Sequence, residues 1–152
     1  MLEIRLRVNG KPFVFNIKGD ETLLHVLRDN GFKEVKAGCE EGLCGSCLVL
    51  LDGKPVNSCQ VLAGSVDGAD VKTVKGIDAE WIVQALADAG GVQCGFCTPG
   101  FVISIYYLLK TMPDADEEDI KKALDGNLCR CTGYVKILEG VRIAMERMKK
   151  NV

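Results

Sequence analysis

The sequence predicts an α+β fold in two parts, with strands in the first half of the chain and helices in the second. Two observations support this prediction. Up to Gly76, apolar and polar residues alternate with period two, as they do in half-buried strands. Beyond Gly76, apolar residues recur at helical spacing, as on one face of an α-helix. We therefore expect one domain over residues 1–76 and a second, all-helical domain over residues 77–152.

The composition limits the partners and the location that we expect. Of 152 residues, 47% are apolar, and 19 basic and 21 acidic side chains give a net charge of −2. Such a chain can bury a core, and its lack of a basic excess argues against a nucleic-acid partner. No apolar run approaches the roughly 18 residues of a membrane span, and the N-terminus lacks the apolar segment of a secretory signal. We therefore expect a cytoplasmic protein, whose eight cysteines favour metal ligation over disulfides.

The first part is predicted to begin with a hairpin and a short helix. Residues 2–8 alternate, Asn9 and Gly10 give a strong hairpin-turn signal, and residues 12–17 form the return strand. Thr22 then precedes a short amphipathic stretch that Gly31 ends, which predicts a helix. His25 lies in this stretch. We expect it to be an ordinary surface or packing residue, because no metal-ligand spacing surrounds it.

A second hairpin, over residues 48–56, and a last strand, over residues 71–74, complete the first part. Four helical stretches follow, and the acidic run 114–119 is expected to be the capped, solvated first turn of the third. The apolar residues of these stretches are expected to form the helical core: Ile82, Val83, Ala85, Leu86, Ala89, Phe101, Val102, Ile105, Tyr106, Leu108, Leu109, Ile120, Ala123, Leu124, Ile137, Leu138, Val141, Ala144, Met145 and Met148.

Four cysteines of the first part lie in and after a glycine-rich segment, with the spacing Cys-x4-Cys-x2-Cys-x11-Cys. They are Cys39, Cys44, Cys47 and Cys59. The first three match the ligand spacing of plant-type [2Fe–2S] proteins. Glycines suit a loop that aims successive backbone N–H groups at sulfur, because such a loop needs φ values that glycine tolerates best. The spacing therefore predicts an iron–sulfur site.

The other four cysteines precede two predicted helices, with the spacing Cys-x2-Cys-x31-Cys-x-Cys. They are Cys94, Cys97, Cys129 and Cys131. We expect Thr98 to cap the first of these helices and Pro99 to begin it. This arrangement would place the first two thiols beside free backbone N–H groups, which favour thiolate.

The spacing of the second four cysteines leaves two kinds of metal site open. A four-thiolate zinc site is the rival of an iron–sulfur site, because Cys-x2-Cys is common in zinc proteins. The one-residue gap crowds tetrahedral ligands, so the pattern favours iron–sulfur. Disulfides are disfavoured without a secretory signal, and a thioredoxin-like dithiol requires a βαβ setting that this region lacks.

Three segments, taken together, resemble one protein family. They are residues 36–47 (Lys-Ala-Gly-Cys-Glu-Glu-Gly-Leu-Cys-Gly-Ser-Cys), 93–100 (Gln-Cys-Gly-Phe-Cys-Thr-Pro-Gly) and 126–134 (Gly-Asn-Leu-Cys-Arg-Cys-Thr-Gly-Tyr). They are similar to the motifs of the small iron–sulfur subunit of the molybdenum hydroxylases, the xanthine dehydrogenase and aldehyde oxidoreductase family. The resemblance covers nearly the whole chain and all eight cysteines. It is specific for the family and weak for the substrate.

The resemblance implies a two-domain electron relay. The first domain would be a ferredoxin-like β-grasp that holds one [2Fe–2S] cluster on the first four cysteines. The second would be a four-helix bundle that holds another cluster on the last four. In the family, the second cluster lies nearer the molybdopterin and the first lies nearer the FAD. Gln93 matches the family glutamine whose side-chain amide hydrogen-bonds the pterin, and the alternative is an amide that bonds its own loop.

The resemblance also implies partners for this chain. A large subunit would hold molybdopterin and oxidise the substrate with oxygen from water, and a medium subunit would hold FAD, in a heterotrimer or a dimer of heterotrimers. No catalytic residue is expected on this chain. We expect an N-heteroaromatic substrate such as a purine or nicotinate. The alternatives are the same relay in a carbon monoxide dehydrogenase, an aldehyde oxidoreductase or a hydroxybenzoyl-CoA reductase, or a stand-alone ferredoxin or zinc-binding interaction module.

Overall fold

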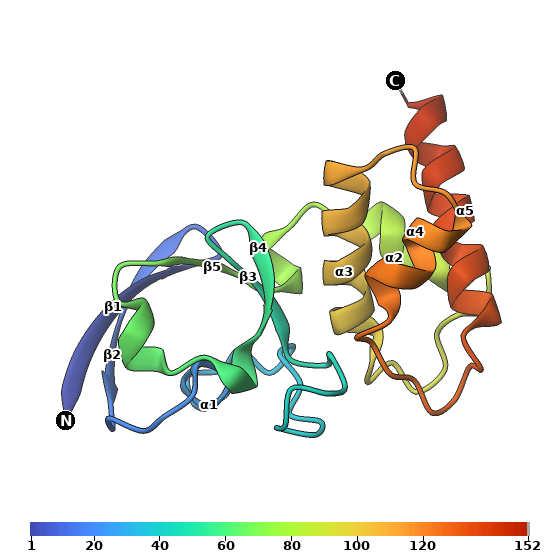
Figure 1. The fold of residues 1–152 in the computed structure, drawn as a ribbon. Helices are drawn as coiled ribbons and strands as arrows, with labels where there is room; N and C mark the ends of the chain where they lie inside the picture. Colours follow the sequence, from blue (N-terminus) through green and yellow to red (C-terminus); the bar gives the residue numbers. More distant parts are fainter. Residues whose placement is uncertain (152) are drawn as a thin grey trace.

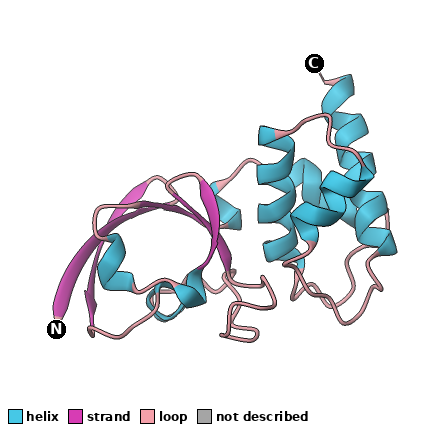
Figure 2. Cartoon of the chain, in the orientation of Figure 1, coloured by secondary structure: helices cyan, strands magenta, loops and turns pink. Residues whose placement is uncertain are grey.

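The computed structural model describes residues 1–151 and has two parts side by side. A five-stranded sheet with a short helix forms the first part, and four helices form the second (Figure 1). Figure 2 shows that the strands are confined to the first part. The predicted α+β fold class is therefore confirmed. The division into domains at residues 76 and 77 stays a prediction.

The sheet joins two hairpins through its middle strand. Its strands are β1 (Leu2–Val8), β2 (Lys11–Ile17), β3 (Leu48–Leu51), β4 (Lys54–Asn57) and β5 (Asp70–Lys72). The strand order is β2-β1-β5-β3-β4. Strands β1 and β2 pair antiparallel, as do β3 and β4, while β5 runs parallel to β1 and antiparallel to β3. Both predicted hairpins are present.

The predicted last strand, over residues 71–74, is only partly right. Strand β5 ends at Lys72, because the next residue bonds to the first hairpin turn instead of to a strand. The Thr73 N–H donates to Asn9 Oδ1 at 2.8 Å, and Asn9 Nδ2 donates to Thr73 Oγ1 at 2.9 Å. Val74 then begins a 3₁₀ turn, η3 (Val74–Gly76). This contact fixes the segment that leads to the helices.

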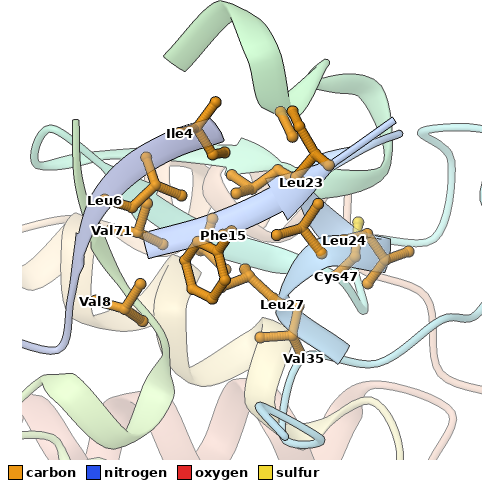
Figure 3. Packing of buried hydrophobic residues seen from close by; sticks show 14 of the residues in the cluster. Ile4, Leu6, Val8, Phe15, Leu23, Leu24, Leu27, Val35, Cys47 and Val71 are labelled. Atoms are coloured by element: carbon orange, nitrogen blue, oxygen red, sulfur yellow. The ribbon is translucent and has the colours of Figure 1, made fainter. Parts of the chain in front are cut away.

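The first core lies between the sheet and α1 (Leu23–Asp29), as Figure 3 shows. The predicted helix is present, and Thr22 caps it by accepting a hydrogen bond from the His25 N–H at 3.3 Å. His25 itself is exposed, with Nε2 3.1 Å from Glu40 Oε2, and is the surface residue that we expected. The labelled core residues are Ile4, Leu6, Val8, Phe15, Leu23, Leu24, Leu27, Val35, Cys47 and Val71.

The second part consists of α2 (Glu80–Asp88), α3 (Thr98–Thr111), α4 (Glu117–Leu124) and α5 (Val135–Lys150). Helix α3 lies nearest the sheet and contacts β3 and β4 (Figure 1). The predicted core residues are buried or packed against the core, with one exception. Val83 is 38% exposed, because it lies one position beyond Ile82 and has turned out of the apolar face.

Two helix starts test the predicted caps. Helix α4 begins with the expected acidic turn, in which Asp116 accepts from the Asp119 N–H at 2.9 Å and Asp119 accepts from the Asp116 N–H at 3.2 Å. The cap predicted for α3 is wrong. Thr98 is already helical and Cys97 is the N-cap, because the Cys97 carbonyl accepts the first hydrogen bond of the helix, from the Phe101 N–H at 3.2 Å.

Candidate metal centres

The eight cysteines are free thiols that neighbour one another in four pairs. The structure therefore brings the cysteines of each predicted quartet together in two pairs. Within residues 1–151, no three Cys, His, Asp or Glu side chains are gathered around a single ion position. The neighbouring pairs are Cys39 with Cys44, Cys47 with Cys59, Cys97 with Cys129, and Cys94 with Cys131. The last pair is hydrogen-bonded, with sulfurs 3.7 Å apart.

Backbone N–H groups surround the first thiol of the glycine-rich loop. The amides of Glu41, Leu43 and Cys44 donate to Cys39 Sγ at 3.3, 3.3 and 3.4 Å. These bonds, that of Glu41 above all, lower the pKa of Cys39 to about 7. Gly42, with a φ of 76°, allows the loop to turn its amides toward the sulfur. The loop therefore has the donor geometry that the sequence predicted.

Two other thiols of this quartet, those of Cys47 and Cys59, are buried. Cys47 immediately precedes β3, and Cys59 lies in a short 3₁₀ turn, η1 (Ser58–Gln60). The Ser58 hydroxyl donates to the Cys47 carbonyl at 2.7 Å and so ties the two segments together. Burial raises the pKa of Cys47 to about 11. A thiolate at this position therefore needs a cation beside it, as a metal ion supplies.

In the second quartet, Cys129 is the thiol that is best stabilised as an anion. The Thr132 hydroxyl donates to Cys129 Sγ at 3.1 Å. Burial raises the pKa of Cys129, but hydrogen bonds from Thr132 and from the Cys131 backbone outweigh it and lower this pKa to about 7. The Cys129 N–H donates to the Tyr134 hydroxyl at 3.1 Å, and Tyr134 turns the chain into α5 with a φ of 72°.

The prediction that the start of α3 favours thiolate is wrong for Cys97. Burial, together with the neighbouring thiols of Cys129 and Cys94, raises the pKa of Cys97 to about 12. Desolvation and repulsion between anions therefore outweigh the partial positive charge of the helix end. A bound metal cation would reverse this balance, because coordinated thiols lose their protons.

Gln93 connects the two loops of the second quartet. Its exposed side chain donates from Nε2 to the Cys131 carbonyl at 3.3 Å. The bond spans 38 positions in the sequence, so it joins the Cys94 loop to the segment before α5. The expected alternative was a bond within its own loop, and the structure shows a bond to the opposite loop instead. The role of Gln93 toward a cofactor stays a prediction.

The two quartets lie close to each other across the two parts of the chain. The Leu128 N–H, one residue before Cys129, donates to the Cys44 carbonyl at 2.9 Å. An open cavity of about 570 Å³ is lined by Cys44 and by all four thiols of the second quartet. Sequence patterns do not predict this contact, because Leu128 carries no polar signal and bonds through its backbone.

The donor sets fit [2Fe–2S] clusters. Such a cluster is held by four cysteine thiolates shared between two irons, so paired thiols are the arrangement that it requires. Both quartets offer two pairs, and both have hydrogen-bond donors beside sulfur. The type of ligand and the pairing of the thiols are therefore both consistent with a [2Fe–2S] cluster at each quartet.

Comparison with known proteins gives the same result. Residues 6–76 match the family described as "2Fe-2S iron-sulfur cluster binding domain", and residues 72–142 match "[2Fe-2S] binding domain". The nicotinate dehydrogenase small FeS subunit of Eubacterium barkeri is 42% identical over 151 residues, which are 96% of this chain and 96% of that protein. The chain belongs to the small iron–sulfur subunits of the molybdenum hydroxylases.

Two further members of this family cover most of the chain. The nicotine 6-hydroxylase small subunit of Paenarthrobacter nicotinovorans is 41% identical over 145 residues, covering 92% of this chain and 87% of that protein. The crystal structure of quinoline 2-oxidoreductase from Pseudomonas putida 86 superimposes with a TM-score of 0.90 at 34% identity. That superposition covers 98% of this chain and 96% of the other.

As an iron–sulfur subunit, the chain is an electron-transfer component with a ferredoxin-like domain followed by a helical domain. The predicted family, oxidoreductase class and [2Fe–2S] cofactors are confirmed, and the complexes of the family contain molybdopterin and FAD. No helix within residues 1–151 has both the length and the apolar character of a membrane span. The cytoplasmic location stays a prediction.

Proposed function

We propose that this subunit relays single electrons between a molybdopterin site on a large subunit and the FAD of a medium subunit. The observation that supports it is the arrangement of eight thiols as four pairs in two adjoining sites. Each bound [2Fe–2S] cluster supplies reversible one-electron chemistry. The ligands of the first cluster are Cys39, Cys44, Cys47 and Cys59, and those of the second are Cys94, Cys97, Cys129 and Cys131.

The chain holds the two sites differently. In the first, backbone N–H groups stabilise Cys39 as a thiolate, and burial shields Cys47 and Cys59 from water. In the second, Cys94 and Cys131 are exposed. The first site is therefore the more buried of the two, and the second is open on one side, where a partner can approach it.

Apolar side chains surround the open site. Phe96 is 45% exposed, Leu128 50% and Tyr134 39%, and all three line the cavity of the second quartet. Exposed apolar residues beside a functional site are typical of protein interfaces. This rim supports docking of the large subunit at the second site. Gln93 is exposed next to Cys94, and we propose that its amide reaches the pterin.

The names of the relatives support an N-heteroaromatic substrate for the complex. Nicotinate, nicotine and quinoline, named for the three proteins compared above, are all nitrogen heterocycles. We propose a substrate of this class and, for the assembly, a heterotrimer in the cytoplasm.

Purification of the tagged chain from its own cells tests the proposal. We expect a molybdenum-containing large subunit and a flavoprotein to co-purify with it. Adding nicotinate, xanthine or an aldehyde without oxygen should then bleach the cluster absorbance, with the N-heterocycles acting fastest. A chain that purifies alone with iron and no partner would instead be a stand-alone ferredoxin, and bleaching by the aldehyde alone would contradict the proposed substrate class.

A further inference from the structure

The two parts of the chain touch at two glycines beside the metal centres. Gly45 follows Cys44, with a φ of 72°, and Gly100 is buried in the first turn of α3. A Cβ on Gly100 would lie less than 3.0 Å from the Gly45 carbonyl oxygen and 3.0 Å from its carbon. Real Cβ atoms do not approach other atoms below 3.0 Å. The two backbones can therefore meet only because Gly100 has no side chain.

Asn127 packs against the same contact. It is 3% exposed, and its Oδ1 accepts from the Ser104 hydroxyl of α3 at 2.7 Å. Its Nδ2 would lie 2.7 Å from a Cβ on Gly45 and 3.3 Å from a Cβ on Gly100. Within residues 1–151, this buried Nδ2 has no hydrogen-bond partner. Burying an amide group without a hydrogen-bond partner costs folding free energy, so close packing against the glycines must hold Asn127 in place.

This contact is joined to a ligand of each cluster by very short stretches of chain. Gly45 is the next residue after Cys44, and Asn127 is two residues before Cys129. Between them, the Leu128 N–H donates to the Cys44 carbonyl at 2.9 Å. Since interiors are close-packed and transmit displacement, moving Gly45 away from α3 would move Cys44 away from Cys129.

We propose that Gly45, Gly100 and Asn127 are positioning residues that set the separation between the two clusters. The proposal rests on the assignment of one cluster to each cysteine quartet. None of the three residues is a ligand, so they act through the neighbouring cysteines. Electron transfer between two centres slows steeply with their separation, which makes this spacing a property that the relay depends on.

The test compares two alanine variants of the chain with both clusters bound. Gly100→Ala places a methyl group against the Gly45 backbone. Gly126→Ala is the matched control, because a Cβ there meets nothing within 4 Å and its φ is outside the left-handed region. The first measurement is the magnetic dipolar interaction between the two reduced clusters, which falls with the cube of their separation. The second is hydrogen exchange of the peptide that contains the Leu128 amide.

We expect Gly100→Ala to weaken the dipolar interaction and to speed exchange of the Leu128 amide roughly tenfold. Gly126→Ala should match the wild type in both. Wild-type values in Gly100→Ala would overturn the proposal. If Gly100→Ala loses a cluster, Asn127→Ala, which removes the side chain without adding bulk, decides in its place. Weaker dipolar interaction in that variant supports the proposal, and unchanged interaction overturns it.

The proposed function and the proposed spacing can fail separately. Iron and sulfide content of the wild-type chain tests whether two clusters are present. The exchange measurement can also be made on chains without bound metal, provided that the variant and the wild type are compared at the same metal content. If the wild-type chain lacks two clusters, the proposed function is contradicted. If Gly100→Ala still speeds exchange of the Leu128 amide in that case, the contact between the two parts is nevertheless supported.

Discussion

At the scale of single residues, the hydrogen bond from Gln93 to the Cys131 carbonyl is the contact closest to the proposed function. It joins the two loops of the second quartet through an exposed side chain. Being exposed and neutral, such a bond has a net worth of about 1 kcal/mol. The residue is therefore dispensable for folding and available for a cofactor.

We expect Gln93→Ala in the assembled complex to keep the fold and both clusters. Its effect should be slower reduction of the clusters by substrate, measured by stopped flow, with reduction from the flavin side nearly unchanged. Gln84→Ala is the control, since Gln84 is an exposed glutamine on α2 that bonds only Asp88 in the described chain. Loss of the clusters would show that Gln93 is structural. Wild-type rates from both sides would show that it has no role in the relay.

The residue scale also shows where sequence reasoning was incomplete. The spacing predicted all eight thiols as ligands, and the structure brings them together in pairs. The spacing did not predict the raised pKa of Cys97. Helix position is visible in the sequence, whereas burial beside Cys129 and Cys94 depends on how distant segments pack.

At the scale of elements, α2 and α5 approach each other closely at Gly140. A Cβ on Gly140 would lie 2.8 Å from Leu86 Cδ2 and 2.9 Å from Leu86 Cα. Alanine favours a helix over glycine by about 1 kcal/mol. Because the Leu86 backbone cannot turn aside as a flexible side chain can, we expect steric strain to outweigh this gain. Gly140→Ala should therefore destabilise the chain by a net 1–3 kcal/mol, roughly.

Chemical denaturation of the cluster-loaded chain measures this effect. The control is Glu146→Ala, an exposed position on α5, which should change the free energy of unfolding by less than about 0.5 kcal/mol. A Gly140→Ala variant more stable than the wild type would mean that the two helices have room to separate.

The elements that sequence predicted well are those with local causes. The turns at Asn9 and Asp52 have φ of 52° and 48°, each followed by a glycine, as the hairpin signals require. The end of β5 was missed because it depends on the hydrogen bonds between Asn9 and Thr73, which are 64 positions apart. The outward turn of Val83 was missed because short apolar stretches do not show which side meets the core.

At the scale of the whole molecule, metal ligation should contribute to folding. The second quartet joins the start of α3 to the start of α5 through four thiolates, so a bound cluster would cross-link these helices. Cys129→Ser should therefore loosen the helical part and remove the spectroscopic signal of one cluster. Hydrogen exchange of α3 and α5 is the measurement.

Cys59→Ser is the matched control for Cys129→Ser. It removes a ligand of the other site and should leave exchange of α3 and α5 unchanged. A helical part that remains fully protected after iron is removed would contradict the idea that ligation stabilises it.

The contacts between the two parts of the chain could not be predicted from the sequence. The motifs identified the family, but nothing in them shows that Gly100 meets Gly45 or that Leu128 bonds Cys44. These contacts arise between backbones, where residue type carries little information beyond the absence of a side chain. The sequence did not determine the substrate either, because the family resemblance assigns oxidation of the substrate to the large subunit.

The metal content of the purified chain tests the central claim most directly. Two [2Fe–2S] clusters require iron and acid-labile sulfide in equal amounts, about four of each per chain. We expect this result, with no stoichiometric zinc. One zinc per chain together with half of that iron and sulfide would show that the second quartet is a structural zinc site, and the proposed two-cluster relay would then be wrong.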